Sequence, residues 1–178
     1  MIPDYTDPKL VVGFKDNLWT SFEVASNRWA LYPSTKTFFN PRSTAPGRGF
    51  WASFPTEYEH SVVGCVPVQG TDAIIKLVAG WNLIGQPFIT PVTWSLEKIQ
   101  VQVGNDVCSL KDAKFLGWIS DYAWGWKQNA DDPYTGEYQL VYDSTLVTGN
   151  EGVLLPWRAY WIRANVACDL ILPHPEAQ

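Results

Sequence analysis

Short runs of aromatic and β-branched residues, each bounded by Pro, Gly or Asn, recur along the chain, as is typical of strands. Ile99–Val103 alternates between apolar residues and glutamine, as a strand with one wet face does. Helical periodicity is scarce, and only Trp94–Ile99 and Ser109–Ala113 predict single helical turns. The pattern predicts an all-β protein built as β-sandwich or barrel-like modules with few short helical turns. The runs are Trp29–Tyr32, Gly49–Phe54, Tyr138–Tyr142 and Ala159–Arg163.

Two segments of the chain resemble two later ones, which predicts an internal duplication. Asp7–Trp19 matches Asp112–Trp124, and Arg28–Phe54 matches Tyr138–Ala164 after a five-residue insertion. The second block has seven identities in 27 positions, where ordinary composition gives roughly one or two by chance. The recurring residues are Asp7/Asp112, Lys9/Lys114, Asp16/Asp121, Trp19/Trp124, Tyr32/Tyr142, Ser34/Ser144, Thr35/Thr145, Asn40/Asn150, Pro46/Pro156, Arg48/Arg158 and Trp51/Trp161.

The duplication predicts two domains. Residues 1–63 form a first, incomplete β repeat, and residues 64–178 form a second, complete β module that includes a unique segment, 71–110. No counterpart of that segment precedes the first repeat. Three explanations stay open: the chain is part of a longer array, the first repeat packs on the other side of the same unique segment, or a partner supplies the missing strands.

Composition and charge exclude some classes of function. The chain is 46% hydrophobic and 17% charged, so we expect a packed core. The net charge is −5 and no cluster of Lys and Arg is present, which argues against nucleic acid as a partner. No apolar run is long enough to enter and cross a bilayer, and the polar, Pro-rich start is not a signal peptide. The chain is therefore either cytoplasmic or the processed form of an exported protein.

The chemistry-bearing residues are sparse, and we expect no cofactor, metal or catalytic residue. Cys65, Cys108 and Cys168 are too widely spaced for a zinc site or a redox pair, so we interpret them as small buried hydrophobes, with one disulfide and one free thiol as the alternative. His60 and His174 lie in Pro-flanked or tail-like sequence, and no nucleophile elbow or phosphate-binding loop is present.

A resemblance to a family can be stated on two motifs. The string Gly80–Phe88, GWNLIGQPF, and the later Pro156–Ile162 element with its Tyr-Trp-Ile resemble repeat modules of large secreted or surface proteins of bacteria and archaea. In those modules the pattern is Gly-Trp-Asn-x-Ile-Gly-Asn-Pro-Phe followed by Tyr-Trp-Val, and Gln86 departs from it. The resemblance implies a secreted or cell-surface, β-rich binding or structural part without catalytic activity. Within it we expect Trp81 to be a core residue and Asn82 to bond a turn.

Aromatic residues next to the inserted loop are the candidate ligand site. A strand through Trp118–Trp126 would place alternate aromatic side chains on one face, and Asp131 and Asp132 follow in the loop. Flat rings stack on the apolar faces of a sugar while carboxylates bind its hydroxyls, so glycan is the favoured ligand, with another protein surface as the alternative. The candidate residues are Trp118, Tyr122, Trp124, Trp126, Asp131, Asp132 and Tyr134.

Other interpretations of these residues remain open. The insertion can be a long polar hairpin loop over a Trp core, and a calcium site on Asp131, Asp132 and Glu137 matches no EF-hand spacing. Arg158 and Tyr160 are expected on the same face of a strand. The pair is either a platform for a ligand or a buried ring whose edge the aliphatic stem of Arg158 covers. A self-assembling subunit using strand donation is the first alternative function. The second is a glycoside hydrolase with two carboxylates chosen from Glu57, Glu59, Glu97, Asp131 and Asp132.

Overall fold

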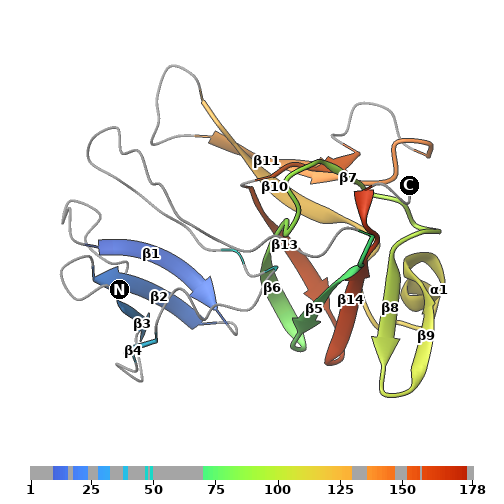
Figure 1. Ribbon diagram of the computed structural model, residues 1–178, viewed down its shortest axis with the longest axis horizontal. Helices are drawn as coiled ribbons and strands as arrows, with labels where there is room; N and C mark the ends of the chain where they lie inside the picture. The colour runs from blue at the N-terminus through green and yellow to red at the C-terminus, as the bar shows by residue number, and fades with distance from the viewer. Residues whose placement is uncertain are drawn as a thin grey trace.

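In the residues that the structure describes, the chain forms β-strands in antiparallel sheets and one short helix (Figure 1). No helix in the described part of the chain is long and apolar enough to cross a membrane. For the strands before residue 40 the description covers the backbone alone. The computed structural model describes residues 10–15, 18–23, 28–32, 38–39, 47, 49, 70–129, 136–146, 152–156 and 158–175.

The first four strands form a sheet of their own, in chain order. Each strand pairs antiparallel with the next, and β1 comes close to β6 of a later sheet. In Figure 1 this sheet is blue and lies at the left. Its strands are β1 (Leu10–Lys15), β2 (Leu18–Glu23), β3 (Arg28–Tyr32) and β4 (Phe38–Phe39).

Two further four-stranded sheets and a two-stranded ladder make up the rest. In the following lists neighbours are hydrogen-bonded. One, the β14 sheet, is β5 (Ala73–Leu77), β14 (Cys168–Leu172), β8 (Gln100–Val103) and β9 (Asp106–Ser109). The other, the β10 sheet, is β11 (Gly136–Val141), β10 (Ala123–Gln128), β13 (Ala159–Ala164) and β6 (Gly80–Gly85). The ladder is β12 (Val153–Leu154) with β7 (Val92–Thr93).

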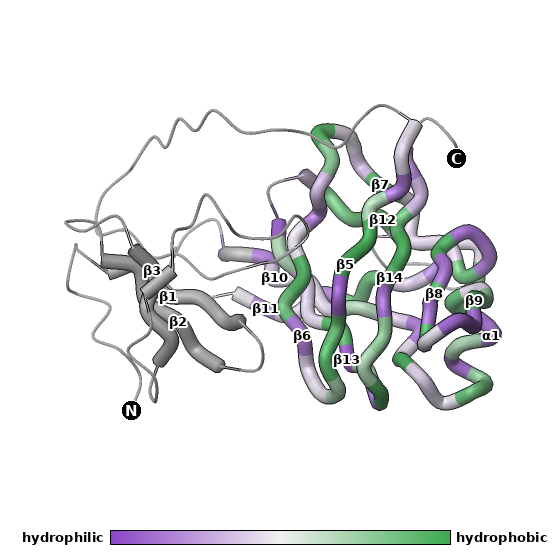
Figure 2. The backbone as a smooth tube through the Cα atoms, turned by 60° about the horizontal axis from the view of Figure 1, so that its bottom comes forward, coloured by the Kyte–Doolittle hydropathy of each residue, from purple (hydrophilic) through white to green (hydrophobic). Residues whose placement is uncertain are grey.

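A hydrophobic core lies between the β14 sheet and the β10 sheet. Ile75 and Leu170 point into it from the β14 sheet, and Tyr160 and Ile162 point into it from the β10 sheet. Trp94, in the connection after β7, is fully buried among them. Buried and more exposed residues alternate along β5 and β14, which produces this arrangement. Figure 2 shows both strands as mostly hydrophobic, each with one hydrophilic stretch. The predicted all-β, sandwich-like fold is confirmed.

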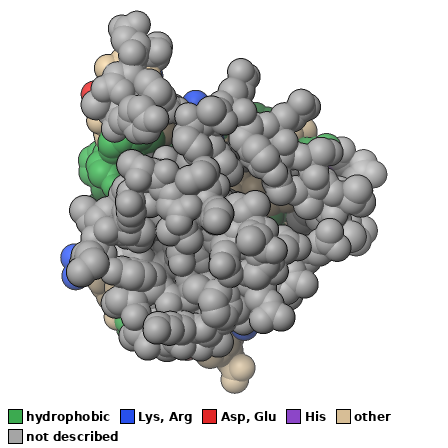
Figure 3. Space-filling model, turned by 90° about the vertical axis from the view of Figure 1, so that its left-hand side faces the viewer, with side chains coloured by type: hydrophobic (Ala, Val, Ile, Leu, Met, Phe, Trp, Pro, Cys, Tyr) green, Lys and Arg blue, Asp and Glu red, His purple; other side chains and the backbone are tan. Residues whose placement is uncertain are grey.

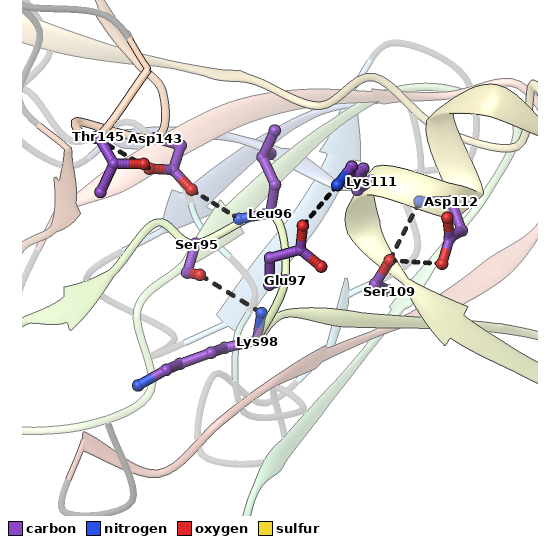
Figure 4. A network of polar contacts seen from close by, with 9 residues as sticks. All are labelled: Ser95, Leu96, Glu97, Lys98, Ser109, Lys111, Asp112, Asp143 and Thr145. Carbon is purple, nitrogen blue, oxygen red and sulfur yellow. Dashed lines mark hydrogen bonds and ion pairs between the residues drawn. The ribbon is translucent and has the colours of Figure 1, made fainter.

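The helix α1 (Leu110–Phe115) begins where the sequence predicts a helical turn. The hydroxyl of Ser109 accepts a hydrogen bond from the Asp112 amide at 3.1 Å and donates to the Asp112 carboxylate at 2.8 Å (Figure 4). This cap satisfies an amide that lacks a helical partner. Leu116 caps the end of the helix, and Gly117 takes a positive φ of 73°, which favours glycine.

The turn between β5 and β6 is closed by the side chain of Asn82, as the sequence predicts. Its carbonyl oxygen accepts from the Val78 amide at 3.0 Å. Its amide group donates to the carbonyls of Val78 at 2.8 Å and Gly80 at 3.0 Å. Trp81, in contrast, is not a core residue: it is 40% exposed, because β6 turns this side chain away from the core.

The two matched halves of the sequence share a hairpin but differ before it. β2 and β3 form an antiparallel pair, and so do β10 and β11 at the aligned positions. Their registers differ, since Trp19 faces Tyr32 whereas Trp124 faces Leu140. The segment Leu10–Lys15 is a strand, but its aligned counterpart, residues 115–120, contains the end of α1 and the turn after it.

Candidate ligand-binding face

The β10 sheet turns one side toward the core and carries aromatic residues on the other. In β10, Ala123 and Gly125 are buried, while Trp124 and Trp126 point to the opposite side and are half-buried. In β13, Tyr160 and Ile162 are buried, and Trp161 lies on the side of Trp124, its cross-strand neighbour. We call this outward side the aromatic face. Its residues are Trp81, Trp124, Trp126, Tyr138 and Trp161, with Tyr122 just before β10.

Edge-to-face contacts order the rings at one end of the aromatic face. Trp126 and Tyr138 face each other across β10 and β11, with ring centroids 5.0 Å apart and planes at 74°. Tyr122 and Trp124 make a similar contact at 6.0 Å and 77°. A Cβ atom at Gly136 would lie 2.7 Å from the Trp126 ring, so this glycine leaves room for the indole. These contacts restrict the orientation of the rings.

Part of the aromatic face is accessible and part is covered. Tyr138 is 53% exposed and Trp81 is 40% exposed, whereas Leu83 between them on the same side is only 7% exposed. Arg163 is exposed and lies opposite Trp81 in the pairing of β13 with β6. Figure 3 looks at the left-hand side of Figure 1 and shows hydrophobic side chains gathered at the upper left. The accessible rings therefore lie toward the ends of the sheet and not at its middle.

Trp118 lies outside β10, so it is not held in line with Trp124 and Trp126. It follows α1, donates its amide to the Ala113 carbonyl at 2.9 Å, and packs against the core. A bulge separates it from β10, because the stretch from Ile119 to Trp124 is longer than the stretch of β13 that it faces. The hydroxyl of Ser120 occupies the bulge and bonds the backbone of Arg163. The predicted alternation required a strand from Trp118 to Trp126, whereas β10 begins at Ala123.

The other predicted site residues divide into two groups. The structure brings together Tyr122, Trp124 and Trp126, as the sequence predicts. Asp131, Asp132 and Tyr134 lie outside the described residues, and so do His60 and Cys65. Within the part of the chain that is described, no three His, Cys, Asp or Glu side chains gather as metal ligands would.

A buried carboxylate beside this face escaped the prediction. Asp121 is 5% exposed and pairs with the Lys114 ammonium at 2.7 Å. Its carboxylate also accepts from the Tyr142 hydroxyl at 3.2 Å, and its backbone carbonyl accepts from the Trp94 indole at 2.9 Å. Burial and the neighbouring Asp121 raise the pKa of Tyr142, and a hydrogen bond and charge from Asp121 raise the pKa of Lys114. These contacts hold the start of β10 to α1 and to the end of β11.

The recurrence in the sequence marks this cluster. Lys114, Asp121 and Tyr142 all recur, as Lys9, Asp16 and Tyr32. Three of the recurring residues thus contact one another in the second segment, with Asp121 at the centre. The recurrence was visible in the sequence, but the distance between these positions along the chain hid their contact.

A second buried carboxylate, Asp143, holds two loops together (Figure 4). It accepts from the Leu96 amide at 3.1 Å, the Thr145 amide at 3.0 Å and the Thr145 hydroxyl at 2.6 Å. Burial opposes its ionisation, but these hydrogen bonds outweigh burial and lower the pKa of Asp143. The carboxylate therefore serves the structure, with its oxygens already engaged.

The remaining candidates for chemistry are engaged in packing or in a surface ion pair. Cys108 and Cys168 are free thiols. Burial, and to a lesser degree the negative charge of Asp169, raises the pKa of Cys168 to about 11. His174 is buried beside Phe88, with ring centroids 5.2 Å apart. Glu97, a candidate acid for hydrolysis, pairs with Lys111 at 2.7 Å on the surface.

No family model matches this chain, and neither the curated proteins nor the solved structures contain a match to it. The aromatic face is thus the main guide to function.

Proposed function

We propose that the chain is a non-catalytic β module that binds a glycan on its aromatic face. The observation that carries the proposal is the pair Trp126 and Tyr138, which meet edge to face and are partly exposed on two paired strands. Exposed aromatic surface on a folded domain is a feature of interaction sites. Rings of this kind stack on the apolar face of a pyranose, and sheet residues hold them in place at little entropic cost.

Tyr122 and Trp124 extend this surface along β10, and Arg163 and Trp81 lie toward the other end of the sheet. A chain of several sugar rings would suit a surface with rings at separate positions. The resemblance of Gly80–Phe88 to modules of secreted and surface proteins supports an extracellular location, where such glycans are common.

Binding to a panel of polysaccharides, measured by affinity electrophoresis and calorimetry, tests the proposal. Trp126→Ala and Tyr138→Ala each remove one ring, and we expect each to weaken binding about tenfold, or about 1.4 kcal/mol. Phe115→Ala is the matched control, because Phe115 is also an exposed aromatic residue, at 78%, but lies at the end of α1.

Two results would contradict the proposal. The first is a wild-type chain that binds none of the polysaccharides. The second is binding that survives Trp126→Ala and Tyr138→Ala, or that Phe115→Ala weakens equally, since either outcome removes the aromatic face as the site.

A further inference from the structure

The outer edge of β6 is occupied by a segment from far earlier in the chain. The Gly49 amide donates to the Leu83 carbonyl at 3.0 Å, and the Gly85 amide donates to the Gly47 carbonyl at 2.7 Å. Reciprocal bonds of this pattern belong to an antiparallel pair. β6 is thus bonded on one side to β13 and on the other to Gly47 and Gly49.

This edge accepts glycine and little else at both positions. A Cβ atom at Gly49 would lie 2.7 Å from the Ala159 Cβ and 2.8 Å from the Ile84 carbonyl oxygen. Gly47 has a φ of 83°, and a Cβ there would collide with the Ile75 side chain. Both glycines are buried. The occupant must therefore carry Gly-x-Gly, and the sequence aligned with it in the second half has Ala159 where Gly49 stands.

We propose that this edge of β6 is a strand-acceptor site that also takes the Gly47–Gly49 segment of a second copy of the chain. The contacts are backbone hydrogen bonds and close glycine packing, neither of which depends on a covalent connection between donor and acceptor. Every copy carries a segment that fits, and when the internal segment leaves, the exposed N–H and C=O groups of β6 can template pairing with another. The inference is independent of glycan binding.

The first experiment asks whether the edge accepts the segment in trans. In the full chain, Gly49→Val prevents the internal segment from seating, and a labelled peptide of residues 44–52 is then added. We expect the peptide to bind this variant at least about tenfold more tightly than a control peptide with alanine at positions 47 and 49. The Gly85 amide signal in NMR should move toward its wild-type position as the peptide binds. Equal affinity of the two peptides overturns the proposal.

The second experiment uses the unmodified chain and so does not depend on how a variant folds. A tethered segment competes with an effective concentration on the order of 1 mM, so exchange between copies requires concentrations near that value. Light scattering should show a dimer fraction that rises toward this concentration, and Gly49→Val should abolish it. A wild-type chain that stays monomeric throughout refutes a second copy as the occupant.

Discussion

Replacing Asn82 with aspartate changes one amide group to a carboxylate at the turn between β5 and β6. The Asn82 side chain fits this turn because one end accepts from the Val78 amide while the other donates to two carbonyls, at 2.8 Å and 3.0 Å. Aspartate has nearly the same shape and keeps the acceptor. It loses both donors, and its negative charge then faces two carbonyl oxygens in a buried position.

The size of the effect follows from these contacts. Each lost hydrogen bond costs about 1 kcal/mol, and the unpaired carbonyls facing a charge add about 1 kcal/mol more. We therefore expect Asn82→Asp to reduce the free energy of unfolding by about 3 kcal/mol at pH 7. For a chain of this size that corresponds to a fall in Tm of about 6–12 °C.

Acid should relieve part of this penalty. The surrounding carbonyls favour the protonated form of the new carboxyl, so its folded pKa is raised above the ordinary value of about 3.9. A raised folded pKa gives stability that is present at low pH and lost as pH rises through it. The gap to wild type should therefore narrow between pH 7 and about pH 4.

Thermal and urea unfolding, followed by circular dichroism at several pH values, measure the effect. Asn105→Asp is the control, because it adds the same charge at an exposed position in the turn between β8 and β9. A difference between the two variants of less than about 1 kcal/mol at pH 7 would refute the role assigned to the Asn82 amide. A gap that widens on acidification would do the same.

Three further changes test other contacts. The lowered pKa of Asp143 means that its contribution is lost as pH falls through that pKa, so Asp143→Asn should destabilise at pH 7 and flatten the dependence of Tm on pH below about pH 4; parallel melting curves would contradict this. Cys168, buried and with a pKa of about 11, should resist alkylation at pH 8 until the protein unfolds, as mass spectrometry of the modified chain can show; rapid labelling of the native chain would refute its burial. Tyr160→Phe removes the hydroxyl that accepts from the Leu155 amide at 2.7 Å and should cost about 1–2 kcal/mol in urea unfolding, whereas an unchanged midpoint would show that this contact is dispensable.

Local patterns predicted several of the strands and the start of the helix. Alternation in Gln100–Val103 gave β8, and Ser109 gave the start of α1, because both signals depend on near neighbours in sequence. The Asn82 turn was predictable for the same reason. Short-range hydrogen bonding and periodicity leave marks within a few residues, so one sequence suffices to detect them.

Positions that depend on distant partners were harder to predict. Trp81 belongs to a motif that suggests a core residue, yet the side of β6 that faces the core is decided by β13 and not by the motif. The segment before β10 is not a continuous strand, because Ser120 bonds the backbone of Arg163, far along the chain. The aromatic face was found in part from β10 alone. Tyr138 and Trp161 join it only through strand register.

The place of β14 between β5 and β8 has a consequence for the synthesis of the chain. Lys76 of β5 and Asp169 of β14 form an ion pair although they lie 93 positions apart. At usual translation rates of about 5–20 residues per second, β5 leaves the ribosome roughly 5–20 s before the strand it pairs with exists. During that interval Ile75 and Leu77 have no sheet to cover them. We expect slow folding dominated by non-local contacts, and a need for chaperones to shield this strand in the nascent chain.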